Sequence, residues 1–417
     1  MNEQTAAGIV VVGAGQAGGR AVEAMRAAGY AGPLTLVGEE ADPPYERPSL
    51  SKEMLLGSDD VAWVRPRDWY EAEGIALRLG TKAAAIDRPA RTLHLEDGAA
   101  LPYHALLLAT GGRPRPLPVP GADHPRCHPI RALADTRALR PYLRPGAHLV
   151  VVGAGFIGLE AASAALKQGA RVTVIEATSA VMARCVPPEV GAFYADLHAR
   201  HGADIRFQTQ VTAIEDDAGR PVVVLGDGER LLADAVVVGI GILPNLELAR
   251  DAGLAVANGV VVDAFGRTED PSIWAAGDVA SRYDARYGRP VRLESWQNAQ
   301  NAAIAVARNM VGTPVPYTEV PWFWSDQHGL NMQICGMVSA GLPWITRGSL
   351  AAGTALLVQM DGDRPVSAIG INAARDLRFA KELIALDAAV PAATLADPSV
   401  KLNDLVRNLK RDLRPVA

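Results

Sequence analysis

Cysteine is scarce in this chain, whose 417 residues include only Cys127, Cys185 and Cys335. These three form neither a CxxC pair nor a cluster with metal-ligand spacing, so we predict no bound metal and three reduced thiols, as is typical of a cytoplasmic protein. Basic residues are not in excess either, because 41 Lys and Arg face 46 Asp and Glu, for a net charge of −5. This balance argues against general nucleic-acid binding.

Long uninterrupted hydrophobic runs are also lacking. The N-terminal stretch MNEQTAAGIVVVGAG has no basic leader followed by an apolar segment, so we expect no signal peptide. The most apolar stretch, residues 147–166, is interrupted by three glycines and carries a histidine and a glutamate. That composition favours a buried strand, turn and helix over a membrane span. We therefore expect a soluble cytoplasmic protein without a membrane partner.

Short apolar runs alternate with alanine-rich helical stretches, the pattern of α/β domains with parallel sheets. A strand, glycine turn, helix and second strand are predicted over residues 8–40, and the same order is predicted again over residues 148–177. A length of 417 residues suggests two or three domains. The predicted fold is α/β, with two Rossmann-like dinucleotide-binding domains, like those of glutathione reductase, and a C-terminal α+β domain.

The first glycine turn has the form Gly13-x-Gly15-x-x-Gly18. In such a turn the first glycine permits a tight bend, the second lets the backbone approach a phosphate, and the third lets the helix pack close to the strand. Glu39 comes at the end of the next predicted strand, where a carboxylate can accept a hydrogen bond from a ribose hydroxyl.

The second turn repeats the arrangement with Gly153, Gly155 and Gly158, and Glu176 takes the place of Glu39. One such motif is weak evidence, but two copies with the same strand and acid context predict two bound dinucleotides, a flavin and a nicotinamide. Glu176 suits a ribose 2′-hydroxyl and repels a 2′-phosphate. The residues just after Glu176 include no arginine, and the first basic side chain that follows is Arg184, so NADH is favoured over NADPH.

Several further motifs extend over essentially the whole chain. They are RPSLSK (47–52), LLATGGRPR (107–115), WAAGDVA (274–280), RLESWQNA (292–299), PWFWSDQ (321–327) and LADPSVKLNDL (395–405). Together with the two turns, they resemble the FAD- and NADH-dependent ferredoxin reductases of bacterial oxygenase systems, of the putidaredoxin reductase and biphenyl dioxygenase reductase types. The resemblance implies an FAD-binding domain at 1–115 and 246–321, an NADH-binding domain at 116–245 and a C-terminal domain at 322–417.

In this family the first turn binds FAD. The resemblance implies that Lys52 lies near the flavin, Ala83 contacts the adenine through its backbone, and Trp296 lies at the isoalloxazine edge. Asp278 is implied at the ribityl and pyrophosphate groups, and the planar fork of Arg131 suits the pyrophosphate. The full set of implied FAD positions is Gly13, Gly15, Ala17, Gly18, Glu39, Arg47, Lys52, Ala83, Ala109, Thr110, Gly111, Arg131, Asp278 and Trp296.

The second turn binds NADH in the family. The positions carried over are Gly153, Gly155, Ile157, Gly158 and Glu176, and Gly241 is a further cofactor-binding position. The resemblance also implies that Glu160 faces the nicotinamide and pairs with Lys52. Lys52 and Glu160 are therefore the predicted catalytic residues.

The resemblance implies an NADH-dependent ferredoxin reductase that passes electrons singly to a 2Fe–2S ferredoxin. That ferredoxin would feed a cytochrome P450 or a Rieske-type ring-hydroxylating oxygenase. No cysteine precedes Cys127, which excludes the dithiol route of the related disulfide reductases. Alternatives left open are a rubredoxin reductase, an NADH oxidase, and a redox-sensing flavoprotein of the apoptosis-inducing-factor type. A monomer and a homodimer both fit the sequence.

Overall fold

The computed structural model describes residues 7–412, so the outermost residues of the predicted first and last domains, 1–6 and 413–417, lie outside the described residues. The chain forms two compact units. The first unit comprises 1–49, 60–113 and 242–318, and the second unit comprises 50–59, 114–241 and 319–417. The predicted second and third domains, together with residues 50–59, thus fall in one unit, and their division into separate domains stays a prediction.

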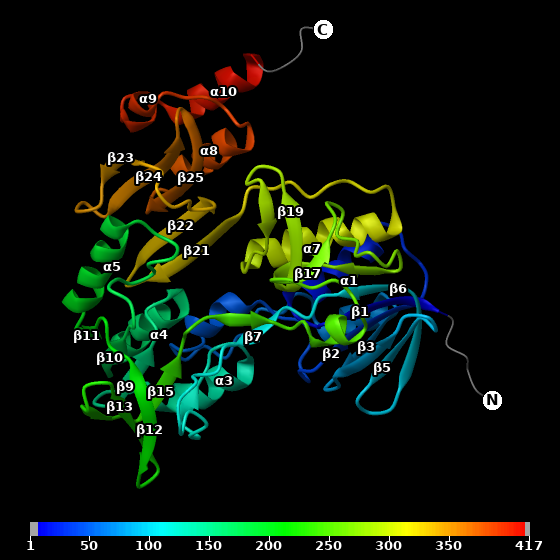
Figure 1. Cartoon of the computed structure of the whole chain (residues 1–417), viewed down its shortest axis with the longest axis horizontal. Coiled ribbons are helices and arrows are strands. Elements are labelled where there is room, and N and C mark those ends of the chain that lie inside the picture. Colours follow the sequence, from blue (N-terminus) through cyan, green and yellow to red (C-terminus); the bar gives the residue numbers. More distant parts are fainter. Residues whose placement is uncertain (1–6, 413–417) are drawn as a thin grey trace. The chain divides into compact units, whose positions relative to one another are not determined.

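The first unit is built on a seven-stranded sheet (Figure 1). Its strand order is β3 (Ile75–Leu79), β2 (Leu34–Gly38), β1 (Gly8–Val12), β6 (Ala100–Leu108), β5 (Thr92–Leu95) and β4 (Ala83–Asp87), with β18 (Ile273–Ala275) also paired to β6. The strands β1, β2, β3, β6 and β18 run parallel. All five residues of β1 are buried, as expected of a central parallel strand covered on both faces.

Helices α1 (Gln16–Ala27) and α7 (Trp296–Val311) pack against each other in the first unit. Both have alanine-rich buried faces, which allow close helix packing. The remaining elements of this unit are η1 (Arg47–Ser51, whose last two residues belong to the second unit), α2 (Arg67–Ala72), β7 (Gly112–Pro114, ending at the boundary), β16 (Ile242–Pro244), α6 (Glu247–Asp251), β17 (Val260–Val262), η3 (Gly277–Val279), β19 (Ala280–Asp284) and β20 (Arg289–Val291).

The second unit begins with a parallel five-stranded sheet. Its order is β11 (Ala203–Arg206), β10 (Arg171–Ile175), β9 (His148–Val152), β15 (Ala235–Val238) and β8 (Cys127–His128). Helix α4 (Phe156–Lys167) contacts β9, β10 and β15, and helix α5 (Pro188–Arg200) contacts β11. The unit also contains α3 (Leu133–Leu139), η2 (Arg140–Tyr142) and the small antiparallel sheet β12 (Val211–Asp217), β13 (Arg220–Leu225) and β14 (Arg230–Leu232).

The C-terminal part of the second unit is an antiparallel sheet of order β21 (Trp322–Gln327), β22 (Leu330–Gly336), β25 (Arg364–Ile371), β24 (Thr354–Asp361) and β23 (Trp344–Ser349). Helix α8 (Ala374–Ala385) lies against β22 and β25, and α10 (Leu402–Asp412) packs on α8 (Figure 1). The short helix α9 (Ala392–Ala396) contacts β23. The predicted α/β class, with two dinucleotide-binding folds and a C-terminal α+β part, is confirmed.

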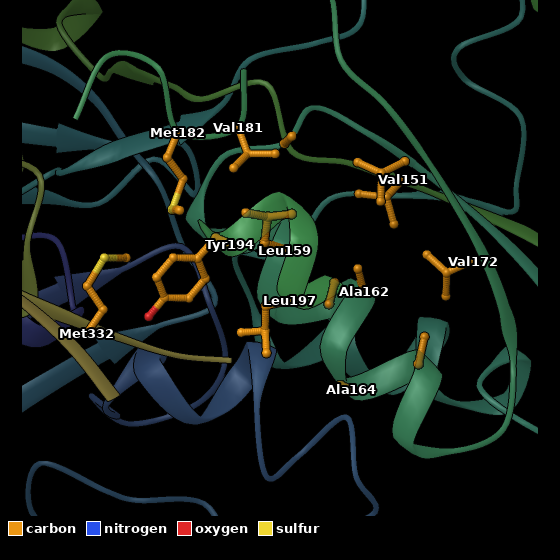
Figure 2. Packing of buried hydrophobic residues seen from close by; sticks show 14 of the residues in the cluster. Val151, Leu159, Ala162, Ala164, Val172, Val181, Met182, Tyr194, Leu197 and Met332 are labelled. Carbon is orange, nitrogen blue, oxygen red and sulfur yellow. The ribbon is translucent and has the colours of Figure 1, made fainter. Parts of the chain in front are cut away.

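One hydrophobic core joins the second glycine-turn fold to the C-terminal sheet. Figure 2 shows Tyr194 of α5 beside Leu159 of α4, with Met332 of β22 close to the tyrosine ring. Full burial of a side chain of this size contributes about 1.5–3 kcal/mol. The core therefore makes α4, α5 and β22 a rigid support for polar residues that they carry. None of the helices within residues 7–412 has the length and apolar character needed to cross a bilayer.

Candidate active site

The first glycine turn is sterically closed to side chains at two positions. Gly13 has φ 111°, and a Cβ added there would lie 2.2 Å from the carbonyl oxygen of Ala109. A Cβ added at Gly18 would lie 1.9 Å from the carbonyl oxygen of Gly13. These contacts bring the start of α1 against the end of β6, so only glycine permits this turn.

Gly15 has space around it and a positive charge nearby. A Cβ added at Gly15 would meet Nη2 of Arg47 at 3.7 Å. The Arg47 guanidinium donates to Glu40 Oε1 at 2.6 Å and to the Tyr45 hydroxyl at 3.0 Å. Burial lowers the pKa of Arg47, but Tyr45, Glu40 and Asp278 outweigh it, and the net pKa is raised. A cation beside an open glycine at a helix N-terminus fits the pyrophosphate of FAD.

Other predicted FAD positions of the first unit lie on several elements around this turn. A Cβ added at Gly277 would come 2.9 Å from the Ala17 side chain, so η3, which carries Asp278, lies on the first turn of α1. The Thr110 hydroxyl donates to the carbonyl oxygen of Asn245 at 3.1 Å. The Gly111 carbonyl accepts from the Asn245 N–H at 3.0 Å.

The last three positions of this unit are Glu39, Ala83 and Trp296. Glu39 directly follows β2 and is exposed, whereas Ala83 begins β4 at the far edge of the main sheet. Trp296 is the first residue of α7, after Ser295, which caps that helix by accepting from the Asn298 N–H. Their roles in FAD binding stay predictions.

The second glycine turn has the same closed geometry. Gly153 has φ 100°, and a Cβ added there would lie 2.6 Å from the Gly239 carbonyl oxygen. A Cβ added at Gly158 would lie 2.1 Å from the Gly153 carbonyl oxygen. Gly155 is again the more open position, because an added Cβ would lie 3.8 Å from the Gly239 carbonyl oxygen. This geometry fits a second dinucleotide.

Glu176 is tied to the second turn at the end of β10. Its Oε2 accepts from the Ala154 N–H at 2.8 Å, and its Oε1 accepts from the N–H and the hydroxyl of Thr178, both at 2.7 Å. The carboxylate is thereby fixed beside the glycine turn, where the sequence pattern predicts a ribose contact.

The other predicted cofactor positions of the second unit are Ile157, Gly241 and Arg131. The Ile157 side chain at the start of α4 is exposed. Gly241 has φ 101°, and a Cβ added there would lie 3.8 Å from Nη2 of Arg184. Arg131 precedes α3, and its backbone N–H donates to Asp135 Oδ2 at 2.9 Å. The predicted contact of Arg131 with FAD stays a prediction.

The predicted pair of Lys52 and Glu160 is present as a buried ion pair in the second unit. Lys52 Nζ lies 2.8 Å from Glu160 Oε2, and Glu160 is only 4% exposed. The hydroxyl of Ser51 also donates to Oε2, at 2.5 Å, and that of Ser325 donates to Oε1, at 2.7 Å. Removing one partner of such a buried pair costs about 3–5 kcal/mol, because the other charge is left uncompensated.

Several neighbours of Glu160 were not predicted as site residues from the sequence. Ser325 and Gln327 lie two apart on β21 and so share one face of the strand, and Gln327 Nε2 donates to the Ser325 hydroxyl at 2.9 Å. His198 of α5 contacts Gln327 and His328. All three residues of SDQ are polar, so the sequence pattern does not indicate that Ser325 and Gln327 are buried while Asp326 between them is partly exposed.

Comparisons with known proteins agree with this geometry. Residues 7–303 match the family model described as pyridine nucleotide-disulphide oxidoreductase, and residues 322–406 match the one described as reductase C-terminal. The chain is 44% identical to the anthranilate 1,2-dioxygenase system ferredoxin–NAD(+) reductase component of Burkholderia cepacia, over 94% of this chain and 98% of the relative. It is 39% identical to putidaredoxin reductase of Pseudomonas putida, over 97% and 98%.

A solved structure is similar over nearly the full length. The covalent complex of putidaredoxin reductase with putidaredoxin contains a chain that superimposes with a TM-score of 0.93 at 38% identity, covering 98% of this chain and 100% of that one.

Proposed function

Because this chain belongs to the pyridine nucleotide-disulphide oxidoreductase family, and within it to the ferredoxin–NAD(+) reductases, we propose that it is an NADH-dependent ferredoxin reductase. It accepts a hydride from NADH and delivers the two electrons one at a time to a 2Fe–2S ferredoxin, which serves a cytochrome P450 or a ring-hydroxylating oxygenase. FAD, when bound, supplies the conversion between a two-electron donor and a one-electron acceptor.

The observation that carries the proposal is the presence of two closed glycine turns in one chain, each fitted to a dinucleotide. Arg47 and the Gly13–Gly18 turn would hold the FAD pyrophosphate, and Glu176 with the Gly153–Gly158 turn would hold NADH. All three cysteines are free and belong to the second unit, so the unit that carries the first turn contains no thiol of its own. Electrons therefore leave without a disulfide intermediate.

Lys52 and Glu160 are the residues that we place beside the nicotinamide. The ion pair holds a carboxylate oxygen and an ammonium group in fixed positions with little solvent access. Such fixed charges orient the reacting partners and exclude water, which is how positioning lowers a barrier to hydride transfer. We also place the protein in the cytoplasm, where NADH is the available donor and free cysteines such as these stay reduced.

The test is anaerobic reduction of the purified holoprotein by NADH, followed in a stopped-flow spectrometer through loss of flavin absorbance. Electron delivery to a 2Fe–2S ferredoxin is then compared with delivery to rubredoxin and to oxygen alone. We expect bleaching by NADH and the fastest turnover with the 2Fe–2S ferredoxin. A colourless protein that FAD does not reconstitute, or a yellow one that NADH does not bleach, would contradict the proposal.

Glu160→Ala tests the role of the ion pair. We expect flavin reduction to slow by about tenfold or more, a typical loss when a positioned charge is removed. The exposed Glu189→Ala on α5 is the matched control and should react at the wild-type rate. An unchanged hydride-transfer rate in Glu160→Ala would remove Glu160 from the mechanism.

A further inference from the structure

A continuous chain of buried hydrogen bonds extends from Glu160 to a cluster of three histidines, all within the second unit. Beyond Ser325 and Gln327, the chain continues from Gln327 Oε1 to Nε2 of His198 at 2.9 Å, and from Nδ1 of His198 to Nε2 of His328 at 3.1 Å. His201 stacks on His328 with ring centroids 4.0 Å apart. The donor chain is defined here as Glu160, Ser325, Gln327, His198 and His328.

The direction of every proton in the donor chain follows from the chemistry of its members. Gln327 donates to the Ser325 hydroxyl through its Nε2, and its Oε1 faces His198. Because a carbonyl oxygen accepts but does not donate, His198 must carry a hydrogen on Nε2. Neutral His198 then has a bare Nδ1, which accepts from a hydrogen on Nε2 of His328. Each donor therefore points toward the Glu160 carboxylate.

The cluster is built to hold this arrangement. His198, Gln327 and Ser325 are each at most 1% exposed, so their polar groups depend on one another rather than on water. His328 adopts a left-handed backbone with φ 49°, and its N–H donates to the Ser163 hydroxyl of α4 at 2.9 Å. A non-glycine residue in that conformation persists only where its surroundings enforce it.

Burial keeps the two inner histidines neutral at ordinary pH. It lowers the pKa of His198 to about 4, with a smaller opposing contribution from its bond to Gln327. The pKa of His328 is lowered to about 3, mainly by burial and in smaller part by the neighbouring His198 and His201. Both imidazoles therefore hold one proton each near neutral pH, as the donor chain requires.

We propose that His198 and Gln327 are positioning residues for Glu160, which fix the Ser325 hydroxyl as a donor to Oε1 and so leave Oε2 turned toward Lys52. The inference rests on the proposed function, because it assigns these residues to the orientation of the carboxylate beside the nicotinamide. Neither residue touches the reacting atoms in this scheme. Their effect on hydride transfer is carried by the orientation of the Glu160 carboxylate.

The first measurement does not depend on activity. In holoprotein with ¹⁵N-labelled histidine, the resonances of His198 and His328 are assigned through single variants and their tautomers are read at pH 6–8. We expect both rings to carry the hydrogen on Nε2, with slow exchange for the buried His198. A hydrogen on Nδ1 of either ring would reverse the chain and overturn the proposal.

The second measurement is the limiting rate of flavin reduction at saturating NADH. His198→Leu removes the donor, whereas His198→Gln places an amide donor near the original Nε2 position. We expect His198→Leu and Ser325→Ala to slow reduction by about five- to tenfold, the loss of one net hydrogen bond in the transition state, and His198→Gln to stay within about twofold of wild type. Retained FAD and an unchanged melting temperature in Ser325→Ala would exclude a merely structural effect.

His201→Gln is the control, because His201 belongs to the cluster but lies outside the donor chain, and it should react like wild type. If His198→Leu and Ser325→Ala react at the wild-type rate while Glu160→Ala is slow, the positioning role is overturned and the proposed function stands. If NADH fails to reduce even the wild-type flavin, the proposed function fails, and the tautomer measurement still decides the direction of the chain.

Discussion

The two glycine turns share a backbone and differ in what surrounds them. Ala17 in the first turn is 8% exposed, because η3 lies on it, whereas Ile157 at the same place in the second turn is 42% exposed. Arg20 on α1 corresponds in position to Glu160 on α4. The former pairs with Glu23 and Glu46 near solvent, and the latter is buried against Lys52.

We expect this difference to separate a resident cofactor at the first turn from an exchanging one at the second. A turn whose second helical residue is covered by neighbouring structure suits a ligand that stays bound, while a turn with an exposed apolar side chain at that position suits one that arrives and leaves in each cycle. The glycine motif therefore indicates which class of ligand binds, and we expect the burial of the turn to indicate whether that ligand stays bound.

We expect alanine at the third glycine of each turn to have the largest effect on cofactor binding. Gly18→Ala brings a Cβ into the Gly13 carbonyl oxygen, so we expect purification of protein without FAD. Gly158→Ala has the same clash with Gly153 and should give yellow protein that NADH no longer reduces. Visible flavin absorbance and anaerobic NADH titration measure the two outcomes.

Gly15→Ala separates folding of the turn from the approach of the pyrophosphate, because the nearest protein atom to its new Cβ is a flexible arginine terminus 3.7 Å away and the turn can keep its fold. It should lose less FAD than Gly18→Ala. Loss of flavin from Gly158→Ala, with NADH binding intact, would show that the two turns hold their ligands in the opposite order.

As the pH falls, we expect the second turn to be destabilised before the first. The helix after the second turn carries Glu160, which is linked by hydrogen bonds to the buried histidines. Folded His198 titrates near pH 4 and an unfolded histidine near 6.5, since burial disfavours the charged ring. Between these values the unfolded state binds more protons, so stability falls as pH falls through this window and is fully retained above it. Between pH 7 and 4, the free energy of unfolding of the wild type should fall by up to about 3 kcal/mol more than that of His198→Gln.

Denaturant unfolding at several pH values measures that difference, and NADH binding should weaken at a higher pH than FAD retention does. Parallel stability curves for the wild type and His198→Gln would contradict the assignment of acid sensitivity to this ring.

Arg47 is a charged residue beside the first turn that has no counterpart among the residues described at the second. Arg47→Ala removes the cation beside Gly15, and we expect FAD to dissociate about 10- to 100-fold more readily, as for loss of a charge-assisted hydrogen bond. NADH affinity should change little, because Arg47 contacts Glu40, Tyr45 and the first turn. Dialysis against FAD-free buffer measures the retention.

Arg47→Lys is the matched variant, since lysine keeps the charge and loses the planar fork. It should fall between the wild type and Arg47→Ala. Equal FAD retention in all three proteins would remove Arg47 from the binding site.

Local features of the site could be predicted from the sequence, and remote ones could not. The turn glycines and Glu176 lie within one strand-turn-helix-strand segment, whose periodicity and spacing indicate their places. The pairing of Lys52 with Glu160 came from a family resemblance rather than from spacing. The bonds from Ser325 to Glu160 and from His198 to Gln327 join residues 165 and 129 positions apart, and they depend on how β21 packs on α4 and α5.

Residues 50–59 interrupt the first unit and belong to the second. This division affects how chimeric proteins should be designed. A chimera that exchanges residues 114–241 alone would take Lys52 from one parent and Glu160 from the other. A chimera between homologues should therefore exchange residues 50–59 together with 114–241, and also residues 319–417, which supply Ser325. A chimera therefore keeps Lys52, Glu160 and Ser325 from one parent only when it exchanges whole structural units rather than single sequence motifs.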